Sequence, residues 1–243
     1  MNFIERFLNR YGYYKLVSSK YYLTQEDGEL KIAPQYKNDN TFDEEKVKEA
    51  TKLLLEGLGE DTTRPGLIDT PKRVMKYWRE LTEGSHYTNK EIADMYRKDF
   101  QVSFDPIVFK ECKNVFSHCE HHLALMFNGT VYVAYVPAYW NGKDDSDGYR
   151  VIGLSKIPRI VDMCSRRLQL QEKLVADIAE CIELATGSDQ VYVEAILDHG
   201  CVSARGIKAS GITETTYMSP RLRKNTEARR EIQNKVVLTR SRS

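Results

Sequence analysis

Two short segments of the sequence concentrate the residue types that bind transition metals. Cys119, His121 and His122 fall within four consecutive positions, and one glycine separates His199 from Cys201. A cysteine and a histidine three residues apart can present a sulfur and a nitrogen to one tetrahedral ion, and zinc suits this set best among the common metals. The alternative is a core cysteine beside surface histidines. The second segment favours a metal site, because both groupings could then face one pocket.

The number of ligands decides which kind of zinc site this would be. A structural zinc ion takes four protein ligands, whereas a catalytic one takes three and keeps a position for water. Cys119, His122 and Cys201 supply three, which leaves His121 and His199 uncoordinated. Free imidazoles beside a metal can transfer protons near neutral pH. The residues therefore predict hydrolytic zinc rather than a structural zinc knuckle.

The second metal-binding segment follows a predicted strand. The apolar run 191–197 is typical of a strand, so we expect His199 and Cys201, two residues apart, to face the same side. Arg205 would lie on that side as well if the strand continued regularly.

The first segment lies in a predicted strand pair. Runs at 107–117 and 130–137 have the composition of strands. We expect the turn at Cys119 and a chain reversal at Asn128 and Gly129 to join them.

Helices are expected around these strands. One would begin after Ser155, and a second would cover residues 170–185 and end at Gly187. Other helices are expected to begin at Thr41 and Thr70 and to cover residues 227–238. The polar stretch 138–150 is expected to be a solvated loop.

Composition limits the class of protein. The chain has 243 residues, a formal net charge of +1 and 41% hydrophobic residues, which suits one sizeable domain with terminal additions. A nearly neutral chain argues against a dedicated nucleic-acid binder, and the sequence has no apolar run of about 18 residues to span a membrane. Five scattered cysteines predict a reduced, cytoplasmic protein without a disulfide framework.

Four segments, in this order, resemble the motifs of the GTP cyclohydrolase I family. They are residues 119–122 (Cys-Glu-His-His), 151–157 (Val-Ile-Gly-Leu-Ser-Lys-Ile), 169–172 (Gln-Leu-Gln-Glu) and 199–207 (His-Gly-Cys-Val-Ser-Ala-Arg-Gly-Ile). The similarity runs from about Thr41 to about Thr216. Four separate motifs at consistent intervals make it specific.

The resemblance implies a reaction. Members of this family are zinc-dependent hydrolases that act on a cyclic amidine C–N bond of GTP and rearrange it to 7,8-dihydroneopterin triphosphate with release of formate. That reaction is the first step of folate, pterin or 7-deazaguanine synthesis. The residues alone suggest only hydrolysis of an anionic substrate at a zinc site.

The resemblance also implies a role for each matching residue. The implied zinc ligands are Cys119, His122 and Cys201. The implied catalytic residues are His121 and His199 as acid/base groups and Ser155 near the ribose. The implied guanine-recognising residue is Glu172, with Gln171 beside it in the substrate-binding set. The implied triphosphate-binding cations are Lys156, Arg159, Arg205, Arg73 and Lys76.

The resemblance implies an α+β tunnelling fold, in which the order ββααββ forms an antiparallel sheet with helices on one face. We expect residues 1–40 to be an extension of unknown role, 41–100 a helical region, and 101–243 the catalytic domain with a C-terminal helix. Such a unit has bare sheet edges, and the resemblance implies that subunits pair these edges and close into a multi-strand barrel. The family suggests a homodecamer, a dimer of pentamers, with sites shared between subunits.

Two other interpretations fit some of these residues. A nitrile reductase of the same fold would use a nucleophilic cysteine and a nicotinamide cofactor, but the sequence has no glycine-rich dinucleotide fingerprint. A noncatalytic zinc protein that only assembles or regulates would bind metal without turnover.

Overall fold

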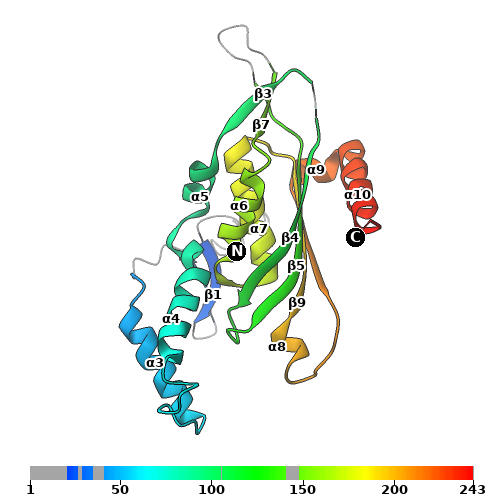
Figure 1. Ribbon diagram of the computed structural model, residues 1–243. Coiled ribbons are helices and arrows are strands. Elements are labelled where there is room, and N and C mark those ends of the chain that lie inside the picture. Colours follow the sequence, from blue (N-terminus) through cyan, green and yellow to red (C-terminus); the bar gives the residue numbers. More distant parts are fainter. Residues whose placement is uncertain (1–20, 27–28, 35–40, 105, 141–147, 243) are drawn as a thin grey trace.

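A five-stranded sheet organises the protein. The computed structural model describes residues 21–26, 29–34, 41–104, 106–140 and 148–242 (Figure 1). The strand order of the sheet is β10-β9-β5-β4-β8, and every pair is antiparallel except the short parallel pair of β4 and β8. The strands are β4 (Val108–Cys119), β5 (Leu125–Tyr135), β8 (Leu168–Gln169), β9 (Val191–His199) and β10 (Thr213–Met218).

Two helices, α6 (Lys156–Ser165) and α7 (Gln171–Thr186), cover one face of this sheet. The order β4, β5, α6, α7, β9, β10 confirms the predicted ββααββ arrangement and the α+β class. Helix α7 ends where predicted, because Gly187 takes the left-handed conformation with φ of 71° that suits a helix terminus.

The core lies between these helices and the sheet. Ile157, Ile160 and Ile178 are fully buried and belong to one apolar cluster with Val131 and Val193 of the sheet. Burying each such side chain stabilises the fold by about 1.5–3 kcal/mol. This packing holds α6 and α7 against the sheet.

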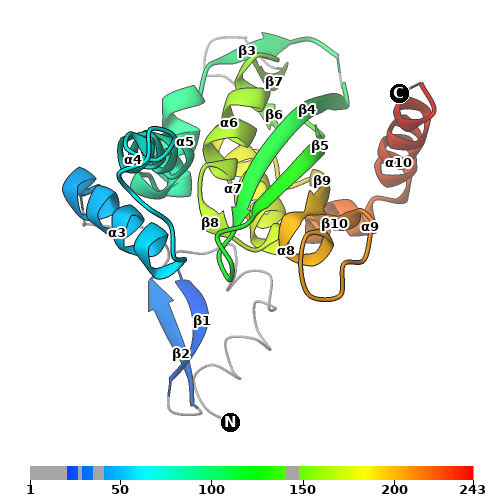
Figure 2. The same cartoon turned by 60° about the horizontal axis from the view of Figure 1, so that its bottom comes forward.

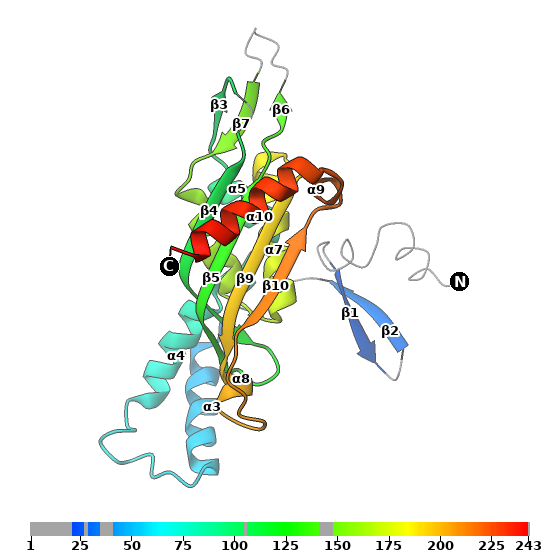
Figure 3. The ribbon, with the colours of Figure 1, turned by 90° about the vertical axis from the view of Figure 1, so that its right-hand side faces the viewer.

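The C-terminal segment lies on the opposite face of the sheet, which adds a layer to the predicted arrangement (Figure 3). Helices α9 (Pro220–Lys224) and α10 (Thr226–Arg240) form a second apolar cluster with Tyr132 and Tyr192. Arg240 contacts the buried Glu194 and lies 5.7 Å from the centre of the Tyr132 ring.

Helices precede the sheet in sequence, as predicted (Figure 2). They are α3 (Glu44–Gly57), α4 (Thr70–Leu81), the short 3-10 helix η1 (Glu83–His86) and α5 (Asn89–Tyr96). Helix α3 begins three residues later than expected, because the Asp43 side chain, not Thr41, accepts from the Lys46 amide (3.0 Å). Among the described residues, no helix has the length and apolar character needed to cross a membrane.

Two small sheets complete the described structure. One contains β3 (Asp99–Val102), β7 (Gly148–Ile152) and β6 (Tyr139–Trp140). The other is a hairpin of β1 (Tyr21–Glu26) and β2 (Glu29–Pro34) within the N-terminal extension. The polar stretch 138–150 was expected to be a solvated loop, but its described ends pair as β6 and the start of β7. Its centre, residues 141–147, lies outside the described residues, as does most of the segment 1–40.

The predicted reversal at Asn128 and Gly129 is wrong. Strand β5 already begins at Leu125, and these two residues form an irregularity inside it, where the pairing register shifts on both sides of the strand. Asn128 has a positive φ of 52°, and a Cβ atom on Gly129 would lie 2.2 Å from the Val115 carbonyl oxygen. Asn128 and Gly129 therefore form a β-bulge instead of a turn, because β4 and β9 pair with β5 on both sides of them.

A buried charged cluster joins the helical region to the sheet domain. Arg167 and Asp177, both at most 1% exposed, form an ion pair of 2.6 Å. Lys173 contacts the same carboxylate, and the Asn89 amide donates to it at 3.1 Å. Arg167 also donates to the Gly84 carbonyl of η1 (3.0 Å) and to Asn89 Oδ1 at the start of α5 (2.8 Å), so one arginine connects η1 and α5 to α7.

Candidate active site and metal centre

Cys119, His122 and Cys201 converge at one end of the sheet. Their ligand atoms all lie within 4.8 Å of one another. The Cys119 sulfur is 3.9 Å from His122 Nδ1. Tetrahedral zinc bonds of about 2.0–2.3 Å place neighbouring ligand atoms about 3.4–3.8 Å apart, so the three residues fit such an ion with little movement.

The three residues come from different local structures. Cys119 is the last residue of β4 and is buried, and His122 lies in the exposed turn that follows. Cys201 belongs to α8 (Gly200–Ser203), a single helical turn directly after β9. The expectation that His199 and Cys201 share one regular strand is therefore wrong, since the strand ends at His199. The turn of α8 nevertheless brings Cys201 to the other two residues.

The electrostatics of Cys201 bear on metal binding. Burial, followed by the neighbouring Cys119 sulfur, raises the pKa of the Cys201 thiol above its ordinary value. The thiolate form of Cys201 is therefore disfavoured while no cation lies beside the two sulfurs. A divalent ion bound between the two sulfurs would instead favour the thiolate form of Cys201, because metal coordination stabilises the deprotonated sulfur.

The other two histidines lie beside this cluster and outside it. His121 Nδ1 is 3.8 Å from the Cys119 sulfur, and its side chain is exposed. His199 is half-buried at the end of β9, and its Nε2 lies 2.6 Å from the Gln171 Oε1 atom. Burial lowers the pKa of His199, against the opposing effect of Glu172 and Asp198, so the imidazole is neutral near pH 7. The division between metal ligands and proton carriers stays a prediction, because His121 Nδ1 is as close to the Cys119 sulfur as His122 Nδ1, at 3.9 Å, is.

Gln171 and Glu172 open helix α7 next to His199. Glu172 is exposed, and its charge acts on His199, which places the carboxylate near that ring. Gln171 is 2% exposed, and its amide nitrogen donates to the Ala195 and Thr213 carbonyls, both at 2.9 Å. The side chain of Gln171 is thus committed to the protein, whereas that of Glu172 is free to meet a ligand.

The expected cations are only partly brought together. Arg205 is close to the centre, since its guanidinium lies 2.9 Å from His122 Nε2. Arg73 is exposed on α4, one turn before Tyr77, whose hydroxyl contacts the buried His118 beside Cys119. Residues four apart share a helix face, so Arg73 is on the face of α4 that meets the Cys119 turn.

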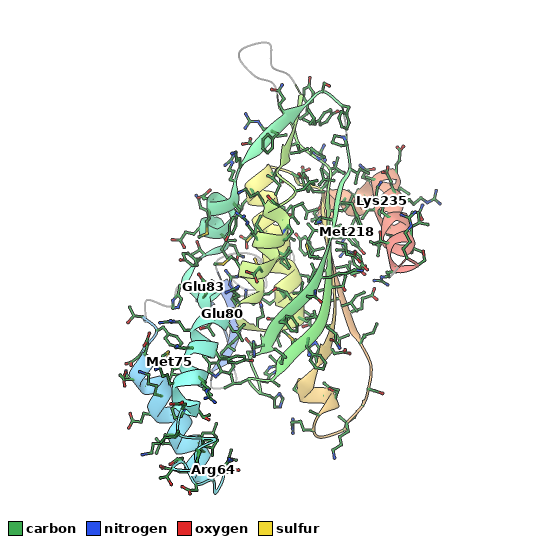
Figure 4. All side chains as sticks on the ribbon, in the orientation of Figure 1. Arg64, Met75, Glu80, Glu83, Met218 and Lys235 are labelled. Atoms are coloured by element: carbon green, nitrogen blue, oxygen red, sulfur yellow. The ribbon has the colours of Figure 1, made fainter. Side chains whose placement is uncertain are left out.

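Lys76 lies on a different part of α4. It lines a shallow hollow with Arg79, Glu80, Glu83 and His86. Figure 4 labels Glu80 near the end of α4 and Glu83 in η1, which follows it. Two carboxylates beside Lys76 make this hollow a poor site for a triphosphate.

Ser155, Lys156 and Arg159 lie far from the metal cluster within one chain. They lie at the start of α6, and the chain leaves the end of α6 through β8, which pairs with His118 and Cys119. A ten-residue helix is about 15 Å long, so about one helix length separates these residues from the Cys119 turn. Within one chain the structure does not bring them to the metal cluster.

The contact between Tyr77 and His118 was not predicted from the sequence. The Tyr77 hydroxyl lies 2.6 Å from His118 Nε2, and the Trp78 ring is 5.0 Å from the same imidazole. Burial lowers the pKa of His118, so this ring is a neutral hydrogen-bonding group. It ties α4 to the strand that ends in Cys119. The residues around Tyr77 do not predict that it contacts His118, which lies 41 positions away in the sequence.

The fold and the site together define a class: an α+β protein of the tunnelling type, with an open cysteine–histidine–cysteine centre that could hold a metal ion. Comparison with known proteins narrows this class. The sequence matches the family described as GTP cyclohydrolase I over residues 47–237. The chain belongs to the GTP cyclohydrolase I family, which confirms the prediction from its motifs.

Curated relatives agree with this assignment. The chain is 44% identical over 181 residues to GTP cyclohydrolase 1 of Clostridium acetobutylicum, covering 72% of this chain and 88% of that protein. It is 43% identical over 203 residues to GTP cyclohydrolase 1 of Clostridium botulinum (strain Loch Maree / Type A3), covering 81% and 97%. For GTP cyclohydrolase 1 of Clostridium beijerinckii the identity is 41% over 198 residues, covering 78% and 95%.

Proposed function

We propose that this chain is a zinc-dependent enzyme that hydrolyses GTP, releases formate and forms 7,8-dihydroneopterin triphosphate. One observation carries the proposal: Cys119, His122 and Cys201 converge within 4.8 Å, with two further histidines next to them. The relatives named GTP cyclohydrolase 1 support the same reaction over the nitrile reductase alternative. The product would enter folate, pterin or 7-deazaguanine synthesis.

Zinc is the metal that the donor set favours. Two thiolates and one imidazole are soft and borderline ligands, and three protein ligands leave one position for water or substrate. Zinc held by Cys119, His122 and Cys201 would act as a Lewis acid and make water nucleophilic near neutral pH.

The neighbouring side chains supply proton transfer and recognition. His199 and His121 can deliver a proton to the imidazole ring of guanine, because both lie beside the cluster without belonging to it. The Glu172 carboxylate can accept hydrogen bonds from the ring nitrogen and the exocyclic amine of guanine. It would discriminate against adenine, since an unpaired polar group in a closed site is costly.

The triphosphate brings roughly four negative charges, which several cations must neutralise. Arg205 and Arg73 would contribute to this task from the same chain, and Lys76 is a weaker candidate in its acidic surroundings. Lys156 and Arg159, with Ser155 for the ribose, would come from a neighbouring subunit, because about one helix length separates them from the metal cluster of their own chain.

A shared site requires an assembly, and the sheet offers edges for one. In the described sheet, β10 has a partner on one side only, and β8 covers only the last two residues of the outer edge of β4. Pairing β10 of one subunit with β4 of the next would satisfy both edges and close a barrel. We propose the homodecamer, a dimer of pentamers, that the family suggests.

We also propose that the chain divides into three regions and that the protein works in the cytoplasm. Residues 41–100 form a helical region, 101–243 the catalytic domain with its C-terminal helix, and 1–40 an extension. All five cysteines are free thiols, although the sulfurs of Cys164 and Cys181 are only 3.6 Å apart. Free thiols at that separation suit a reducing cytoplasm.

The test is turnover of GTP by the purified, zinc-loaded protein. Formate release together with the appearance of pterin fluorescence after oxidation is the expected result, and ATP should give neither. A protein that retains zinc and leaves GTP intact would be the noncatalytic alternative, and the proposed function would then be wrong.

A further inference from the structure

Gln171 was expected to bind substrate, but its contacts point to another role. The side chain is 2% exposed and spans three partners: the Ala195 carbonyl, the Thr213 carbonyl and the His199 ring. Two of these partners are backbone groups of β9 and β10. The third is the imidazole that we propose as a proton carrier.

The hydrogen bonds fix which way the amide faces. An amide nitrogen has two hydrogens and donates only, whereas the amide oxygen accepts only. Both hydrogens of Gln171 are used, because its nitrogen lies 2.9 Å from each of two carbonyl oxygens. Turning the amide over would place its oxygen against both carbonyl oxygens, with no hydrogen between them. The three contacts therefore decide which atom of the amide faces His199.

The orientation of the amide in turn fixes the tautomer of His199. The Gln171 oxygen lies 2.6 Å from His199 Nε2 and can only accept, so Nε2 must carry a hydrogen. In a neutral imidazole the other nitrogen, Nδ1, is then the bare one. Any proton that His199 gives to or takes from a substrate passes through Nδ1.

We propose that Gln171 is a positioning residue, which holds His199 as the Nε2–H tautomer and presents Nδ1 for proton transfer. This inference rests on the proposed function, in which His199 is a proton carrier. Because the same amide bonds β9 and β10, the ring orientation is tied to the sheet rather than to the exposed loop that follows α8.

Two substitutions of Gln171 distinguish an effect on the His199 tautomer from a loss of folding stability. Gln171→Met keeps the length of the side chain but removes every hydrogen bond. Gln171→Glu, protonated in this buried position, keeps an oxygen that can accept from His199. We expect Gln171→Met to lower kcat about 10- to 100-fold, the size of loss that follows when a metal-bound histidine loses its orienting hydrogen-bond partner. KM should change less than about threefold and zinc content not at all, while Gln171→Glu should restore most of kcat.

A matched control is available two residues earlier. Gln169 is also buried, and its amide donates to the Ser117 hydroxyl (3.0 Å) and the Cys164 carbonyl (2.8 Å) without touching His199. Gln169→Met should lower stability as Gln171→Met does, and should leave the His199 tautomer unchanged.

The decisive readout is the protonation of the two ring nitrogens. Solid-state 15N NMR of histidine-labelled, zinc-loaded protein can follow all five histidines, and His199→Gln identifies the signals of His199. We expect a hydrogen-bearing Nε2 and a bare Nδ1 in the wild type and in Gln171→Glu, and a mixture of tautomers in Gln171→Met. A wild-type His199 with the hydrogen on Nδ1, or a Gln171→Met variant with unchanged tautomer or kcat, would overturn the inference.

Failure of the proposed function gives a different pattern. If His199→Gln retains wild-type turnover, His199 is no proton carrier, whatever the NMR spectra show for Gln171. If His199→Gln is inactive and the tautomer does not respond to Gln171, only the positioning role is wrong.

Discussion

Replacing Asp177 with alanine should lower the free energy of unfolding more than the loss of an exposed ion pair does. Asp177 is fully buried and compensates two cations, Arg167 at 2.6 Å and Lys173, while Asn89 also donates to it. Removing the carboxylate leaves a fully buried guanidinium without its counter-charge. Breaking a buried pair in this way costs about 3–5 kcal/mol.

A neighbouring pair provides the matched control. Arg166 and Asp162 form the same kind of ion pair at 3.0 Å, but the Asp162 side chain is 57% exposed. Because water screens that pair, Asp162→Ala should cost less than about 1 kcal/mol. The comparison holds the two residue types fixed, whereas burial differs and Asp177 has a second cation, Lys173, beside it.

Equilibrium urea unfolding at one protein concentration measures both variants. Burial alone would raise the pKa of Asp177, but Lys173 and Arg167 outweigh it, so the pKa is lowered. The contribution of Asp177 is therefore complete above its unfolded pKa, and measurements at pH 8 record it in full. If Asp177→Ala loses no more unfolding free energy than Asp162→Ala, the buried cluster does not hold the helical region to the sheet domain as we argue.

Three other substitutions test separate parts of the account. Burial raises the pKa of Glu180 to about 7 from an ordinary 4.5, so the folded state holds this proton more tightly than the unfolded state and stability falls between those pH values. Glu180→Gln should flatten this fall, which is up to about 3 kcal/mol, in unfolding curves taken from pH 4.5 to 8. Glu172→Ala should raise the KM for GTP at least about tenfold with zinc content unchanged, and unaltered kinetics would remove Glu172 from guanine recognition. Gly129→Ala should cost about 1–3 kcal/mol in urea unfolding because its Cβ would meet the Val115 carbonyl, whereas Gly57→Ala, with nothing within 4 Å, should be neutral or stabilising.

Local chemistry made part of the fold predictable. The end of α7 at Gly187 follows from the freedom of glycine at positive φ, and the order of strands and helices follows from runs of apolar residues. The bulge at Asn128 and Gly129 could not be predicted in the same way. Its residues carry a turn signal, and only pairing with two neighbouring strands converts the signal into an irregularity within a strand.

In the site as well, short sequence motifs could be read from the sequence, whereas contacts between residues far apart in the sequence could not. The two cysteine–histidine segments predicted that Cys119, His122 and Cys201 could share one ion, and the structure brings them together even though the chain reaches Cys201 through a helical turn instead of the expected strand. The role of Gln171 depends on the Ala195 and Thr213 carbonyls, which lie 24 and 42 positions away and carry no side-chain signal. Such contacts exist only after the sheet has formed.

Metal content measured alongside turnover tests the central claim most directly. Zinc per chain is determined by mass spectrometry of metals for the wild type, Cys201→Ala and His199→Gln, and GTP turnover is followed in the same preparations. The account predicts that Cys201→Ala loses both zinc and turnover, because one of three ligands is gone. It predicts that His199→Gln keeps its zinc and loses turnover. A Cys201→Ala protein with full zinc, or a His199→Gln protein without it, would contradict the assignment of the metal centre.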